Sequence, residues 1–95
     1  MTPEGKVKDK IKAVFKRCGV YYHMPVQNGM GEPTLDFVAC VNGRFFAVEA
    51  KAPGKKPSQR QQITMDKMAS SGAYVFMVSN DEELAVLEAT IQLVL

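Results

Sequence analysis

The chain has 95 residues, of which 46% are hydrophobic and 23% are charged, and its formal net charge at pH 7 is +2. These values are typical of one globular domain with a packed core, and no apolar run is long enough to span a membrane. The weak positive charge is compatible with nucleic-acid binding but does not require it. Cys18, Cys40 and His23 lack zinc-binding spacing, so we expect both cysteines to be reduced and buried in an intracellular protein.

Residues 2–18 are predicted to form an amphipathic helix. Thr2 is a favourable N-cap, Pro3 suits the first helical position, and Gly19 suits the residue after the helix. The apolar stripe at helical spacing comprises Val7, Ile11, Val14, Phe15 and Cys18. The basic residues of the helix favour a solvated face, which also suits a DNA-facing surface; they comprise Lys6, Lys8, Lys10, Lys12, Lys16 and Arg17.

The next segments predict strands. Residues 20–26 are β-branched and aromatic, which favours a strand, and the glycines and proline of residues 27–33 favour a loop. Residues 35–51 then read as a β-hairpin whose turn is Asn42-Gly43. This dipeptide is the strongest short-range hairpin signal, because a two-residue type I′ turn needs positive φ at both positions.

The second half of the chain alternates between helix and strand. After a basic loop at 52–57, a helix is predicted from the cap Ser58 to about residue 71, followed by a buried strand at 73–79. A last helix follows, capped by Ser79 or Asn80, with the apolar stripe Leu84, Leu87, Ile91 and Val94. That stripe completes the core or packs against a second copy of the chain.

The predicted order is therefore α-β-β-β-α-β-α. A helix between the third and fourth strands implies a crossover connection and a parallel pair of strands. We expect a single α/β domain over residues 1–95, with a mixed β-sheet flanked by helices.

The turn sets the register of the hairpin and places Asp36 opposite Glu49, with Lys51 on the same face. Directly opposed like charges destabilise a sheet, so a shared proton or a bound divalent cation would have to offset their repulsion. The ordinary alternative is that acids near strand ends point to solvent. That alternative is weaker here, because the register places the two acids opposite each other and the strand around Glu49, "FFAVEAK", is otherwise apolar.

These residues resemble a known signature. Asp36 followed by Glu49-Ala50-Lys51 is similar to the acid and (D/E)-x-K motif of the PD-(D/E)xK nuclease superfamily, whose fold is restriction-endonuclease-like. The closer resemblance is to the VRR-NUC (virus-type replication-repair nuclease) domain, and it covers nearly the whole chain. Its matching features, in the family's order and approximate spacing, are Glu4, Gly31, Asp36, "FFAVEAK", "PGKKPS" and Gln61. The chain departs from the family at Leu35, where a proline usually precedes the first acid.

The resemblance implies specific roles. Asp36, Glu49 and the backbone carbonyl of Ala50 would hold Mg²⁺ or Mn²⁺, with Glu4 contributing directly or through a water. Lys51 would orient or activate the attacking water, and Gln61 would support the site. Each of two residues also has an ordinary interpretation: Glu4 complements the helix dipole, and Gln61 is a surface residue beside Gln62.

The basic residues near the motif, Lys55, Lys56 and Arg60, are candidates for DNA phosphate contacts or form a solvated loop. The leading function is a metal-dependent DNA endonuclease of bacterial or phage type, acting in replication or repair. By the same resemblance it would act as a homodimer on branched DNA such as four-way junctions. The alternatives are a non-catalytic DNA-binding or assembly module on the same fold, and an unrelated α/β protein whose acids form a structural network.

Overall fold

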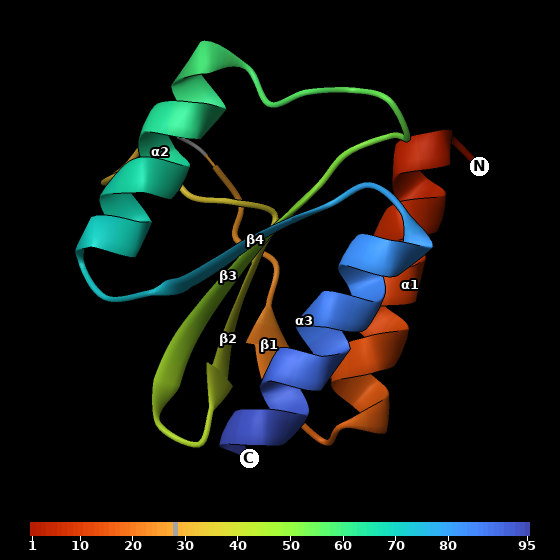
Figure 1. The fold of residues 1–95 in the computed structure, drawn as a ribbon. Coiled ribbons are helices and arrows are strands. Elements are labelled where there is room, and N and C mark those ends of the chain that lie inside the picture. The colour runs from red at the N-terminus through yellow and green to blue at the C-terminus, as the bar shows by residue number, and fades with distance from the viewer. Residues whose placement is uncertain (28) are drawn as a thin grey trace.

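The protein is described by a computed structural model covering residues 1–27 and 29–95, and the predicted loop at 27–33 therefore lies partly outside the described residues. The described elements follow the predicted order α-β-β-β-α-β-α (Figure 1). Their bounds are α1 Pro3–Arg17, β1 Tyr21–His23, β2 Phe37–Val41, β3 Arg44–Ala50, α2 Gln59–Ser70, β4 Tyr74–Val78 and α3 Asp81–Val94.

The four strands found in the described residues form one mixed sheet in the order β1-β2-β3-β4. β1 pairs with β2 and β2 with β3 in antiparallel fashion, whereas β3 and β4 are parallel. The parallel pair is joined through α2, as the predicted crossover requires. The predicted mixed α/β fold is confirmed.

The hairpin has the register that its turn requires. Asn42 and Gly43 have φ angles of 51° and 80°, and the ladder runs from Val41 opposite Arg44 to Phe37 opposite Val48. One detail of the prediction was wrong: β2 begins one residue after Asp36, and β3 ends one residue before Lys51. Asp36 and Lys51 therefore lie just beyond the ends of the strands rather than within them.

The helix boundaries follow from capping. Thr2 Oγ1 accepts a hydrogen bond from Gly5 N over 2.9 Å, which caps α1. The cap of α3 is Asn80, whose side chain accepts from Glu83 N over 2.8 Å, so the structure decides between the two predicted candidates. No helix among the described residues is long and apolar enough to cross a membrane.

Helices α1 and α3 lie side by side on one face of the sheet, and α2 lies on the other (Figure 1). The main core fills the layer between the sheet and the pair α1/α3, and the predicted stripes of both helices pack into it. Its fully buried members include Ile11, Phe15, Phe37, Val48, Leu87 and Ile91. The stripe of α3 therefore completes this core.

The opposite face of the sheet is only partly covered by α2. Side chains alternate along a strand, so Phe46, Val48 and Ala50 face the core while Glu49 faces α2. The prediction that both cysteines are buried was wrong: Cys18 is only partly buried against the core, and Cys40 is exposed. It lies in register with Tyr21 and Phe45, both exposed as well, because this row of the sheet has no helix packed over it.

Candidate active site

The acids Asp36 and Glu49 are joined by reciprocal hydrogen bonds at the end of the hairpin. Asp36 N donates to Glu49 Oε1 over 3.2 Å, and Ala50 N donates to Asp36 Oδ2 over 3.0 Å. The strand ladder stops at Phe37 and Val48, so the next backbone N–H groups need other acceptors. Each carboxylate satisfies one of these donors, which fixes both acids at the end of the sheet.

Glu49 is deeply buried, with 4% of its surface exposed, and its pKa is raised from 4.5 to about 7. Burial is the largest cause of this raised pKa, and the negative charge of Asp36 is the second. The hydrogen bond from Asp36 N and the charge of Lys51 lower the pKa of Glu49, while the charge of Glu4 raises it further. Near neutral pH both the protonated and the ionised forms of this carboxyl group are therefore populated in the metal-free protein.

Gln61 reaches the acid pair from the first turn of α2. Its Nε2 donates to Glu49 Oε2 over 2.8 Å, and its Oε1 accepts from Ser58 N over 2.9 Å. Gln61 N also donates to Ser58 Oγ over 3.1 Å, which completes a capping box at the start of α2. The capping box thus holds the amide with its donor toward Glu49. Gln62, the other candidate, bonds instead to Asp66 on the surface of the helix.

Lys51 flanks the acid pair from the end of β3. Its Nζ lies 3.9 Å from Glu49 Oε2, and 16% of the side chain is exposed. Its backbone N donates to Val78 O over 3.0 Å, which extends the contact with β4 and fixes the residue. The structure therefore brings the ammonium next to the acids, as the sequence motif implied.

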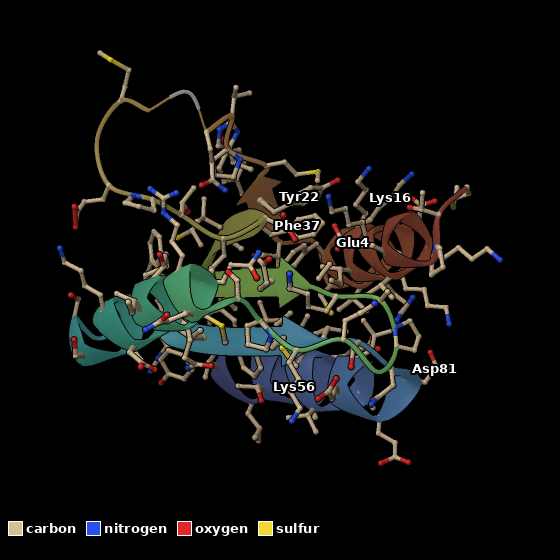
Figure 2. All side chains as sticks on the ribbon, turned by 90° about the horizontal axis from the view of Figure 1, so that it is seen from above. Glu4, Lys16, Tyr22, Phe37, Lys56 and Asp81 are labelled. Carbon is tan, nitrogen blue, oxygen red and sulfur yellow. The ribbon has the colours of Figure 1, made fainter. Side chains whose placement is uncertain are left out.

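Glu4 approaches from α1, but its partner is a lysine. Glu4 Oε2 lies 3.5 Å from Lys8 Nζ, and the same ammonium lies 3.9 Å from Asp36 Oδ1. Figure 2 shows Glu4 on the side of α1 nearer the sheet. Sequence reasoning assigned Lys8 to the basic face of the helix, although its spacing of four residues from Glu4 is the spacing of a helical ion pair.

A cleft of about 820 Å³ opens beside the acids. It lies between the start of α2 and the loop before β2, and its lining includes Asp36, Glu49, Gln61 and Arg60. Of the three basic residues predicted to contact DNA, only Arg60 lines this cleft among the described residues. Lys55 and Lys56 are exposed on the preceding loop, and Figure 2 shows Lys56 well apart from Glu4.

The donor set suits a hard divalent cation. The two carboxylates supply oxygen ligands, which Mg²⁺ prefers. Within a strand the N–H and C=O of one residue point to the same side, so the Ala50 carbonyl is on the same side of β3 as its N–H, which donates to Asp36. Among the residues that the structure describes, no group of three His, Cys, Asp or Glu side chains is arranged to hold a metal ion. The third acid, Glu4, is paired with Lys8.

Comparison with solved structures gives a clear match. A solved structure described as a VRR_NUC domain aligns with a TM-score of 0.79 and 25% sequence identity, covering 92% of this chain and 95% of that chain. This chain has the fold of a VRR_NUC domain. The predicted resemblance is thereby confirmed over almost the whole VRR_NUC-like domain. No protein-family model and no curated protein matches the sequence.

Within this VRR_NUC-like fold, Leu35 stands where the family usually has proline. Leu35 is fully buried. The position therefore contributes an apolar side chain to the interior directly before Asp36, and the acid keeps its hydrogen bond to Ala50 N.

Proposed function

We propose that this protein is a metal-dependent nuclease that hydrolyses phosphodiester bonds in DNA. The observation that carries the proposal is the acid pair Asp36 and Glu49, joined by reciprocal hydrogen bonds with Lys51 beside it. The fold it shares with a VRR_NUC domain supports the same reaction class.

The proposed metal ligands are Asp36, Glu49 and the backbone carbonyl of Ala50, with Glu4 contributing directly or through a water. When bound, Mg²⁺ or Mn²⁺ would lower the pKa of a water molecule and neutralise charge that develops on the phosphate. The raised pKa of Glu49 supports this assignment, because a nearby cation would relieve the repulsion between two adjacent carboxylates.

The other residues of the site would position the reacting groups and balance the negative charge of the phosphate. Lys51 would orient the attacking water and stabilise the transition state, which it can do because its ammonium is held beside Glu49. Gln61 would hold Glu49 in one orientation through its Nε2 donor. Arg60 lines the cleft and would bind a backbone phosphate of the DNA, with Lys55 and Lys56 contributing from the exposed loop.

We further propose branched DNA, with a four-way junction as the leading example, as the substrate and a homodimer as the active form. A two-fold dimer would present two sites to a symmetric substrate. Exposed apolar side chains on α3 and at its C-cap support an additional contact of this helix; they are Val86, Leu93 and Leu95. A domain of this size has little surface for reading a long base sequence, so DNA shape would dominate recognition.

A non-catalytic DNA-binding or assembly module is the second candidate. It is favoured by the pairing of Glu4 with Lys8, which leaves the described acids without a third converging partner. This candidate predicts DNA binding that does not need a divalent metal. The acid pair argues against it, because bare carboxylates repel phosphate unless a cation bridges them.

The test is cleavage of duplex, single-stranded, flap and four-way-junction DNA with Mg²⁺, with Mn²⁺ and with EDTA. Wild type is compared with Lys51→Ala and with Lys12→Ala, a matched loss of one charge on α1 away from the acids. Metal-dependent cleavage that is lost in Lys51→Ala and kept in Lys12→Ala supports the nuclease. Junction binding in EDTA without cleavage under any condition supports the binding module.

A further inference from the structure

Lys8 links an acid of its own helix, Glu4, to Asp36, the acid directly before β2. It lies in the second turn of α1, and its ammonium stands 3.5 Å from Glu4 Oε2 and 3.9 Å from Asp36 Oδ1. About a third of the side chain is exposed, so the ammonium is neither fully hydrated nor sealed from solvent. The contact with Asp36 joins α1 to the end of the hairpin.

Lys8 and Lys51 contact different acids of the site. Asp36 Oδ2 accepts the backbone N–H of Ala50, whereas its other oxygen faces Lys8. Lys51 instead contacts the other acid, at Glu49 Oε2. Lys8 thus balances the charges of Glu4 and Asp36, the two acids that Lys51 does not contact.

We propose that Lys8 is the counter-ion of the metal-free site, and that a divalent cation takes its place between Glu4 and Asp36. The inference rests on the proposed function, because it assigns these two acids to the same metal. A divalent cation held by these two acids would repel an ammonium at the same place. Lys8 therefore moves away from the acids as the metal binds.

This displacement has a measurable consequence for affinity. In wild type the metal must compete with an ammonium that is attached to the chain, so Lys8 weakens metal binding. A variant without that charge keeps both carboxylates and loses the competitor. Because solvent screens the partly exposed pair only in part, removing the ammonium should raise the metal affinity by about fivefold or more.

The experiment is calorimetric titration of DNA-free protein with Mn²⁺, beside the metal-induced rise in melting temperature. Lys8→Gln is compared with Lys12→Gln, which removes the same charge from the same helix but from a pair with Asp9. Lys8→Arg keeps the charge, and Lys8→Met repeats the charge loss with an apolar side chain. Both uncharged Lys8 variants should bind Mn²⁺ about fivefold or more tightly than Lys12→Gln, with a larger rise in melting temperature, and Lys8→Arg should resemble wild type.

The outcomes separate this inference from the proposed function. Equal affinity of Lys8→Gln and Lys12→Gln, with binding abolished in Asp36→Asn, would overturn the role of Lys8 and leave the metal site intact. Weaker binding in Lys8→Gln would also overturn it, because Lys8 would then help to build the site. Absence of Mn²⁺ binding to wild type would overturn both the inference and the metal dependence of the proposed nuclease.

Discussion

Gln61 and Glu49 are joined by a hydrogen bond of 2.8 Å from the side-chain amide to the carboxylate. The direction of this bond is set by Ser58, whose backbone N–H donates to the other end of the amide. A helix cap therefore determines which atom of α2 faces the acid pair. The start of α2 and the end of β3 form one hydrogen-bonded unit.

Replacing Gln61 with glutamate tests the hydrogen bond to Glu49 without removing the hydrogen bond from Ser58 N. Glutamate at this position still accepts from Ser58 N, so the capping box is kept. The donor to Glu49 is lost, and a third carboxylate is placed against a buried acid. Gln61→Glu should therefore lower the free energy of unfolding at pH 8 by about 1 to 3 kcal/mol, measured by urea denaturation. The same substitution at Gln59, exposed at the start of α2, should leave stability unchanged or slightly higher because of the helix dipole.

Replacing Ser58 with alanine tests the cap itself. The side-chain acceptor for Gln61 N is lost, which should lower the free energy of unfolding by about 1 kcal/mol. Ser58→Thr retains the hydroxyl and should restore most of that stability. If Ser58→Ala and Ser58→Thr were equally stable, the capping box would not contribute to the fold.

The raised pKa of Glu49 predicts a pH dependence of the metal-free protein. Between pH 4.5 and about 7 the folded state binds more protons than the unfolded state, so stability falls as pH rises through this window. The loss should approach about 2 to 3 kcal/mol and should be measured by urea denaturation in EDTA from pH 4.5 to pH 8.

Glu49→Gln provides the control for this pH dependence. It removes the titrating group and should flatten the profile over the same window. A profile with the same slope in wild type and Glu49→Gln would show that another group is responsible.

The position of Arg60 predicts a graded effect on DNA binding. Arg60 lines the cleft beside the acids, whereas Lys56 lies on the exposed loop. In Ca²⁺, which should support binding with little cleavage, Arg60→Ala should weaken junction binding more than Lys56→Ala. Arg60→Ala should also lower the slope of log K against log salt by about one. Fluorescence anisotropy at several salt concentrations measures both quantities, and equal slopes in the two variants would contradict this assignment.

The sequence predicted the acid pair because Asn42-Gly43 fixes the hairpin register, which the structure confirms up to Phe37 and Val48. The same turn could not show that the ladder stops there, since this depends on the carboxylates capturing backbone N–H groups. The S-x-x-Q spacing of a capping box that begins at Ser58 could have identified Gln61, rather than Gln62, as the residue that faces the acids.

Other features depended on tertiary packing that no local pattern contains. The exposure of Cys40 follows from which part of the sheet α2 covers, and period-two alternation does not specify this. Lys8 has the spacing of an ordinary surface ion pair with Glu4. Its second contact, with Asp36, arises only when α1 packs against the end of the hairpin.

The two-residue turn also limits how this chain can vary in length. The turn at Asn42-Gly43 sets the register that places Asp36 opposite Glu49. One residue inserted or deleted between the two acids would therefore turn one of them to the opposite face of the sheet. Asn42 is held from a second side, because its Nδ2 donates to Val94 O at the end of α3 over 2.9 Å. Homologous sequences should therefore keep the number of residues between the two acids constant.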